Sequence, residues 1–440
     1  SELFNSTHEL IRWAQRSNLV SVLTDCPHRE RLGWLEQYHL NGPSLRYEFD
    51  LGRLFRKTFQ DMTDAQTQEG LVPSIAPEYI IFEGAFRDSP EWGSALILAA
   101  WQQYVFTGDT SVLEKYYANM KSYFGYLGSK AEDHLLDYGL GDWYDIGPDR
   151  PGVSQLTPIG LTASATYYED AIRLADIADI LGDGHAAAQF RDEAGEIRAA
   201  FNRKYYKPEE HSYATGSQTA NAMAYVLGLV PSGDEEKVLQ SIIKDIRSRG
   251  NGFTSGDVGH RYLLMALAKG NRPDVVFDMH HQSDRPGYGY QLKMGATSLT
   301  EAWDAGPHSS QNHFMLGHIM EWFYHDLVGI APVAELPGFG LIDIKPQPVA
   351  GLSFARARID SVRGPVSVEW KREKTVFVLE AEIPANARAL IQLPARAGQQ
   401  VRESSVPVAE RQEIQFVRQD EAYRVYTLPS GHYRFEVEAL

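Results

Sequence analysis

Apolar residues recur every three or four positions over roughly the first 330 residues of the chain, which is the period of an amphipathic helix. One stripe runs from Trp92 to Ala100, a second from Ala171 to Leu181, and a third from Met315 to Phe323. About eleven or twelve helices are predicted in this way, mostly in pairs. This arrangement favours an (α/α)6 toroid, although the pattern alone does not distinguish it from another large helical fold.

The predicted helices are joined by loops of uneven length. Short connections such as Gly182-Asp-Gly184 carry only turn residues. Long loops carry tryptophans and carboxylates, and they are expected over residues 21–44, 70–91, 133–159, 205–217 and 283–308. In a toroid whose long and short loops alternate, the long loops gather at one end. We therefore expect the unusual chemistry of this chain at a single mouth.

The pattern changes after Gly329. Pro332 and Pro337-Gly338 mark a linker, and apolar residues then alternate with polar ones in runs such as 366–370 and 377–383. Period two with turn residues between the runs predicts an antiparallel β-sandwich of about 100 residues. The chain is therefore expected to consist of a mainly α domain over 1–330 and a β-sandwich over 331–440, the latter with a structural role.

Composition narrows the classes of partner. The 440 residues carry a net charge of −16 without a basic cluster, which argues against nucleic acid and anionic membranes as partners. No apolar run reaches the length of a transmembrane helix, and no signal peptide is visible. The single cysteine, Cys26, excludes an internal disulfide. Because the chain starts at Ser1, we expect a processed or excised piece of a longer protein.

One stretch, Thr24-Asp-Cys-Pro-His-Arg-Glu-Arg-Leu-Gly-Trp34, concentrates charges around a tryptophan without helical or strand period. A second, Gly295-Ala-Thr-Ser-Leu-Thr-Glu-Ala-Trp-Asp304, places Glu301 among small and apolar residues. Sugars expose apolar faces that stack on indole rings, and glycosidic bonds are cleaved between two carboxylates. Glu30 and Glu301 are therefore candidates for acid and base work on a sugar.

These two stretches resemble the signatures of the bacterial α-L-rhamnosidases of glycoside hydrolase family 78. Shorter matches are Gly141-Asp142-Trp143, Gln218-Thr-Ala-Asn221 and Asn312-His-Phe314, in the family's order and over essentially the whole chain. The resemblance covers a helical (α/α)6 catalytic domain and a β tail. It implies further N-terminal β domains in the full-length protein, and a soluble enzyme of the bacterial cytoplasm or periplasm.

What the resemblance implies about residues follows position by position. Glu30 falls on the general acid and Glu301 on the general base of an inverting hydrolase that releases terminal α-L-rhamnose without a cofactor. The remaining matched positions bind or line the sugar, and they are Asp25, Arg29, Trp34, Trp92, Asp142, Trp143 and His313. We further expect the Arg29 guanidinium to pair with Asp25 or with the substrate, and so to leave Glu30 protonated.

One departure concerns specificity. In the family, a Gly-Asp pair commonly follows the signature tryptophan, separated from it by one residue. Here the signature tryptophan is Trp34, and Glu36 and Gln37 occupy the places of that glycine and aspartate. Gln37 can still bond a sugar hydroxyl, but it carries no charge. A metal site is not expected, because His308, His313 and His318 lack metal-ligand spacing. Two alternatives stay open: an (α/α)6-barrel hydrolase of another sugar, and a catalytically inactive carbohydrate-binding homologue.

Overall fold

A computed structural model describes residues 1–373 and 375–438. The chain forms two compact units that are not continuous in sequence. The helical unit comprises Ser1–Leu45, Asp50–Gln102 and Thr110–His318, and the sheet unit comprises Arg46–Phe49, Gln103–Asp109 and the described residues from Ile319 onward. The boundary expected after residue 330 lies later in the chain than Ile319, where the last segment of the sheet unit starts.

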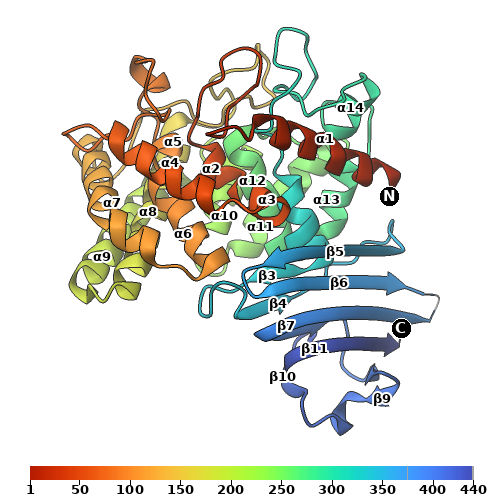
Figure 1. The fold of residues 1–440 in the computed structure, drawn as a ribbon. Coiled ribbons are helices and arrows are strands. Elements are labelled where there is room, and N and C mark those ends of the chain that lie inside the picture. Colours follow the sequence, from red (N-terminus) through yellow and green to blue (C-terminus); the bar gives the residue numbers. More distant parts are fainter. Residues whose placement is uncertain (374, 439–440) are drawn as a thin grey trace. The chain divides into compact units, whose positions relative to one another are not determined.

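The helical unit contains most of the chain's helices (Figure 1). They are α1 (Glu2–Asn18), α2 (Gln37–Leu40), α3 (Gly42–Glu48), α4 (Gly52–Ala65), η1 (Gly84–Phe86), α5 (Pro90–Gly93), α6 (Ala95–Thr107), α7 (Ser111–Lys130), α8 (Ile159–Ile180), α9 (Gly184–Tyr205), α10 (Gln218–Val226), α11 (Glu235–Ser248), α12 (Asp257–Lys269), α13 (Pro273–His280) and α14 (Tyr288–Lys293). A small hairpin of β1 (Tyr206–Lys207) and β2 (Ser212–Tyr213) follows α9. The ends of α3 and α6 belong to the sheet unit.

The helices differ in how much of their surface is buried, and this separates an inner from an outer layer. In α4, the buried side chains Phe55, Thr58, Phe59 and Met62 form a single stripe, as expected of a helix with one face toward solvent. By contrast, α10 and α12 are buried on nearly every side. Inner helices therefore need small or apolar residues all round, whereas outer helices need only one apolar face.

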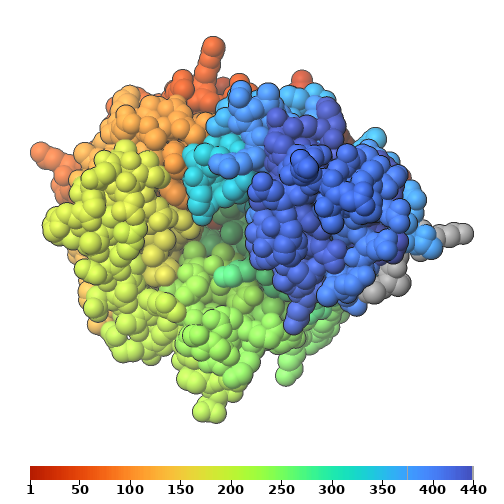
Figure 2. All heavy atoms as spheres, turned by 90° about the horizontal axis from the view of Figure 1, so that it is seen from below, coloured from red at the N-terminus to blue at the C-terminus, as the bar shows by residue number. Residues whose placement is uncertain are grey.

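The helices close into a ring. Helix α8 packs on α7, α9 and α10, helix α10 packs on α11 and α12, and α1 packs on α14. The contact of the first of these helices with the last joins the two ends of the series. Seen from below, the orange, yellow and green parts follow one another around the unit (Figure 2). The expected toroid of paired helices is therefore confirmed.

The sheet unit begins with α15 (Ile319–Trp322) and η2 (Phe323–Val328). Its strands are β3 (Ile330–Pro332), β4 (Leu341–Ile344), β5 (Phe354–Ser361), β6 (Gly364–Arg372), β7 (Val376–Leu393), β8 (Val401–Glu403), β9 (Val406–Pro407), β10 (Gln415–Gln419) and β11 (Arg424–Glu438), with η3 (Val408–Glu410) between β9 and β10. The long strands β7 and β11 pair along most of their length, with an irregularity between Pro429 and Gly431. Strand β6 pairs with the first part of β7, and β4 pairs with a later part of β7.

The C-terminal β architecture agrees with the prediction except in one pairing. Strand β4 runs parallel to β7, whereas the alternating pattern led us to expect antiparallel neighbours throughout. In the helical part, the predicted stripe from Trp92 to Ala100 is divided between α5 and α6, and loop 21–44 already contains α2. Among the described helices, none combines the length and apolarity needed to cross a membrane.

Candidate active site

The first signature loop is closed by its own aspartate. The backbone N–H of Leu32 donates to Asp25 Oδ1 at 2.8 Å, and the N–H of Asp25 donates to the carbonyl of Leu32 at 3.0 Å. Gly33 lies so close to Ala76 that a Cβ would come within 2.5 Å of the Ala76 carbonyl oxygen. Asp25 is therefore buried as the support of the loop, while Arg29 and Glu30 project from it into solvent.

The second signature loop is held in a similar way. The N–H of Glu301 donates to the carbonyl of Ser310 at 2.9 Å, and the N–H of Ser310 donates to Glu301 Oε2 at 2.5 Å. The indole N–H of Trp303 donates to the Ser255 carbonyl at 3.0 Å, and this side chain is buried. Glu301 is thus fixed at both its backbone and its carboxylate, with 15% of its side chain exposed.

The two loops meet through Arg29. Its Nη1 lies 3.8 Å from Glu301 Oε2 and donates to the His308 carbonyl at 3.1 Å. Of the two partners expected for Arg29, Asp25 is not the one found, because its carboxylate is turned back to its own loop; pairing with the substrate stays a prediction. The residue next to the candidate acid therefore contacts the candidate base. In Figure 1 these loops, red after α1 and teal after α14, rise at the same end of the helical unit.

The surroundings of Glu30 favour the protonated form of its carboxyl. Partial loss of solvent raises the pKa of the Glu30 carboxyl most, and the negative charges of Asp25 and Glu301 raise it further. The Trp34 indole N–H, 3.1 Å from Glu30 Oε2, and the Arg29 cation act in the opposite direction. The net shift of the pKa is upward.

Aromatic rings surround the Glu30 side of the site. Trp34 stacks on Phe82 with ring centroids 5.3 Å apart and meets the edge of Phe86 at 6.4 Å. Phe86 in turn contacts Trp143 at 5.7 Å. Both tryptophans are half-buried, so each keeps part of its surface exposed. The two predicted sugar-lining tryptophans are thereby joined through residues of the loop that precedes α5.

Tyr144 is a site residue that the sequence interpretation did not single out. Its hydroxyl lies near enough to the Glu301 carboxylate for that charge to act on its pKa. Burial, followed by the charge of Glu301, raises the pKa of Tyr144 to about 12, so the hydroxyl keeps its proton. Its backbone adopts φ of +62°, a conformation that is costly for a bulky side chain and that concentrates at functional sites.

Two of the predicted contact residues, Asp142 and Trp92, are enclosed. Asp142 is fully buried and accepts from the Thr219 hydroxyl and from the backbone N–H of Gly256 and Gly259, at the start of α12. Burial is the largest influence on its carboxyl and raises its pKa to about 7. Trp92 is 2% exposed. The geometry gives both side chains a supporting place rather than a surface that faces a sugar.

Gln37 is also fully buried. Its amide nitrogen donates to Glu36 at 2.5 Å and to Asp257 at 3.4 Å, and its amide oxygen accepts from Asn41 at 3.0 Å. The hydrogen-bonding capacity that we expected to meet a sugar hydroxyl is used within the protein. Burial also raises the pKa of Glu36, so the pair occupies the protein interior as a hydrogen-bonded, largely uncharged unit.

His313 lies beside the carboxylates. The backbone N–H of His313 donates to the Leu299 carbonyl at 2.8 Å, and the ring nitrogen Nδ1 accepts from the backbone N–H of Met315 at 3.3 Å. Burial lowers the pKa of His313, while the charges of Glu301 and Asp25 raise it less strongly. The ring is therefore neutral, with its proton on Nε2.

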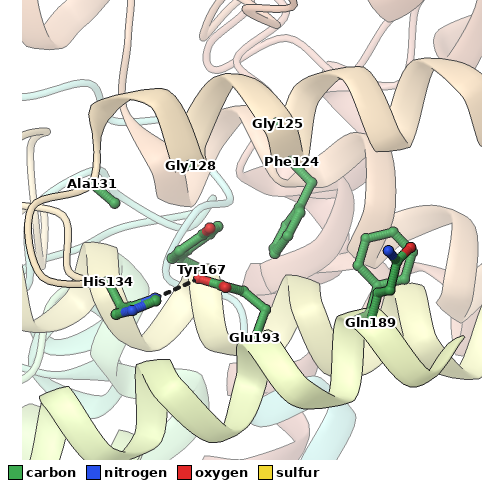
Figure 3. Close-up of a pocket in the computed structure, with 9 residues that line it drawn as sticks. Phe124, Gly125, Gly128, Ala131, His134, Tyr167, Gln189 and Glu193 are labelled. Carbon is green, nitrogen blue, oxygen red and sulfur yellow. Dashed lines mark hydrogen bonds and ion pairs between the residues drawn. The ribbon is translucent and has the colours of Figure 1, made fainter. Parts of the chain in front are cut away.

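A separate hollow of about 450 Å3 lies between α7, α8 and α9 (Figure 3). Phe124 and Tyr167 stack at its floor, 4.8 Å apart, and both are buried. At one end His134 pairs with Glu193 at 2.9 Å. Its charged groups already have partners, and none of the predicted site residues lines it. Within residues 1–373 and 375–438, no three His, Cys, Asp or Glu side chains are grouped to hold a metal ion.

Comparison with known families matches both parts of the chain. Residues 1–327 match the bacterial alpha-L-rhamnosidase 6 hairpin glycosidase domain, and residues 329–406 match the bacterial alpha-L-rhamnosidase C-terminal domain. An alpha-L-rhamnosidase of Streptomyces avermitilis is 30% identical over 447 residues, which cover 99% of this chain and 41% of that protein. One from Formosa agariphila is 24% identical over 99% of this chain and 48% of its own length.

Solved structures give the same picture. The alpha-L-rhamnosidase from Dictyoglumus thermophilum has a TM-score of 0.91 and 31% identity, covering 100% of this chain and 49% of that one. The Streptomyces avermitilis alpha-L-rhamnosidase, solved with L-rhamnose, has a TM-score of 0.90 and 29% identity, covering 99% of this chain and 41% of that one. The chain therefore spans less than half the length of these relatives.

Proposed function

The chain belongs to the family of bacterial α-L-rhamnosidase six-hairpin glycosidases, and on that premise we propose that it hydrolyses terminal α-L-rhamnosides with inversion. The observation that carries the proposal is the placement of two glutamates, Glu30 and Glu301, on loops joined by Arg29. Two carboxyls that face one site can supply the acid and the base that glycoside hydrolysis needs.

Glu30 is the general acid. Its pKa is raised by loss of solvent and by Asp25, so near neutral pH a larger share of its carboxyl is protonated than in water. It gives that proton to the glycosidic oxygen as the bond to the sugar breaks. The Trp34 indole N–H, bonded to Glu30 Oε2, orients the carboxyl.

Glu301 is the general base. Its carboxylate receives the Ser310 N–H and lies beside the Arg29 cation and the Tyr144 hydroxyl, and such neighbours stabilise negative charge. It takes a proton from a water on the face of the sugar opposite the leaving group. Inversion needs room for that water, so the two carboxyls should stand about 6.5–9.5 Å apart with substrate bound.

The sugar is bound between the loops. The open faces of Trp34 and Trp143 supply apolar surface for the CH groups of the ring. Arg29, which is about half exposed, supplies donors for hydroxyls, and His313 supplies its Nε2–H. Asp25, Asp142 and Gln37 act by holding the loops in place. The proposed sugar contacts thus come from four residues on three separate stretches of chain.

The proposal is tested with 4-nitrophenyl glycosides of α-L-rhamnose, α-L-arabinofuranose, β-D-glucuronic acid and α-D-mannose. We expect turnover of the rhamnoside to exceed the others by at least about tenfold in kcat/KM. Proton NMR of the product in its first minute, before mutarotation, is expected to show the anomer opposite to that of the substrate.

Three outcomes contradict parts of the proposal. Preference for another glycoside makes the chain a hydrolase of a different sugar. Binding of rhamnose without turnover of any substrate makes it an inactive homologue. Early appearance of the retained anomer makes Glu301 a nucleophile instead of a base.

A further inference from the structure

The loop over residues 77–86, which we name the apolar loop, exposes an unusual amount of hydrophobic surface. Tyr79 is 63% exposed, Ile80 45%, Ile81 70% and Phe86 41%. Four large apolar side chains exposed within eight residues form a local cluster, which differs from the scattered single exposures that are normal on a soluble protein. Such a patch marks a surface that something apolar covers.

The apolar loop is fixed in place at its base. Arg87 binds Glu78 through two hydrogen bonds, of 2.7 and 3.2 Å. The N–H of Ser74 donates to the Arg87 carbonyl at 2.9 Å, and the Tyr79 hydroxyl donates to the Arg31 carbonyl at 3.0 Å. The exposed isoleucines are therefore presented on a structured loop that is tied to the first signature loop.

The patch is continuous with the candidate acid. Phe82 of the apolar loop stacks on Trp34, and the Trp34 indole donates to Glu30. Phe86, from the same loop, contacts both Trp34 and Trp143. A general acid delivers its proton to the leaving-group oxygen. Residues on the Glu30 side of the site therefore lie next to the leaving group, and not next to the far edge of the rhamnose ring.

We propose that the apolar loop is the leaving-group surface of the site, and that the aglycone it takes is apolar, an aryl or long alkyl group instead of a further sugar. The inference rests on the proposed function. Ile80 and Ile81 cover one side of the aglycone, and Trp34 and Phe86 lie at its junction with the sugar. A hydrophilic glycan leaving group would leave this patch exposed to water without compensation.

The test uses methyl, butyl and octyl α-L-rhamnosides, the last below its micelle concentration. Their leaving groups differ little in acidity, so the chemical step is nearly constant and kcat/KM reports contact with the alkyl chain. A fully buried methylene contributes about fourfold in binding. Because the apolar loop covers the alkyl chain on one side only, we expect kcat/KM of the octyl rhamnoside to exceed that of the butyl rhamnoside by roughly tenfold.

The double variant I80S/I81S should lose most of this gain, so that its octyl-to-methyl ratio of kcat/KM falls by about fivefold or more. The matched control is V362S, which removes an equally exposed apolar side chain (62%) from the sheet unit. Thermal unfolding checks that all proteins are folded, and the control should keep the wild-type ratio.

Each result has one meaning. If the wild type hydrolyses all three rhamnosides with no dependence on chain length, or if I80S/I81S keeps the wild-type ratio, the inference is overturned while the proposed function stands. If I80S/I81S alters only binding to lipid vesicles or to another protein, the patch is a docking surface and the inference is also overturned. If no rhamnoside is hydrolysed, the proposed function fails.

Discussion

Replacing Asp142 distinguishes a supporting role from a sugar contact. Asp142 is fully buried and accepts three hydrogen bonds, at 2.6 Å from Thr219, 2.7 Å from Gly259 and 3.0 Å from Gly256. Asp142→Ala leaves these three buried donors without an acceptor. At about 1–3 kcal/mol for each unsatisfied group, and with the Thr219 hydroxyl free to rotate, the free energy of unfolding should fall by about 3–6 kcal/mol.

Asp142→Asn separates shape from charge. The amide oxygen can accept from two of the three donors, while its own N–H2 faces the third, so a loss of about 1–2 kcal/mol is expected. Thr219→Val removes only the hydroxyl donor. Because the two side chains touch, the effects of Asp142→Asn and Thr219→Val should not add, and the double variant should be more stable than their sum implies.

The assay is urea unfolding followed by far-ultraviolet circular dichroism, with KM for the rhamnoside measured in parallel. A supporting role predicts a large loss of stability in Asp142→Ala, and a KM of Asp142→Asn within about threefold of wild type. The reasoning is refuted if Asp142→Ala costs less than about 1 kcal/mol while Asp142→Asn raises KM strongly, since Asp142 would then meet the sugar directly.

Three further outcomes are expected. Glu30→Gln should slow methyl α-L-rhamnoside much more than the 4-nitrophenyl glycoside, because a good leaving group needs little protonation; equal losses on both would remove Glu30 from its role. Tyr144→Phe should lower kcat by about tenfold or more with little change in KM, if the hydroxyl beside Glu301 bonds its carboxylate during catalysis, since a hydrogen bond to a charged group is worth about 1.5–3 kcal/mol; an unchanged kcat would contradict that role of Tyr144. Burial raises the pKa of Glu36, so its contribution to stability is complete below about pH 4 and is lost as the pH rises through the raised value. Glu36→Gln should therefore gain stability relative to wild type between pH 5 and 8 in thermal unfolding, and a constant difference would refute this.

The helical ring could be predicted from the sequence because its apolar residues repeat with a fixed period. The two signature loops could be predicted because charged residues are concentrated around a tryptophan. Helical stripes have a period, and charges around a tryptophan stand out in a loop. The direction of each side chain within such a loop has no period. Asp142 and Trp143 are neighbours, yet one is enclosed and the other half-open, and only the fold decides which.

Other features leave no local trace. A left-handed conformation is anticipated at glycine or asparagine, so nothing about Tyr144 announced its φ of +62°. Alternation predicts strands but not their partners, and the parallel pairing of β4 with β7 arises only in the assembled sheet. The contact of Arg29 with Glu301 joins positions far apart in sequence, where elementary rules of charge pairing favoured the nearer Asp25.

The contact of α1 with α14 has a consequence for the synthesis of the protein. The N–H of Leu299 donates to the carbonyl of Leu10, and Asn312 accepts from Ser17 and Asn18 at the end of α1. A ribosome that has translated α1 must therefore add nearly 300 more residues before these partners exist, and contacts so distant in sequence form late. The emerging chain carries Glu30 long before it carries Glu301, and the step that closes the ring is also the step that assembles the proposed catalytic pair.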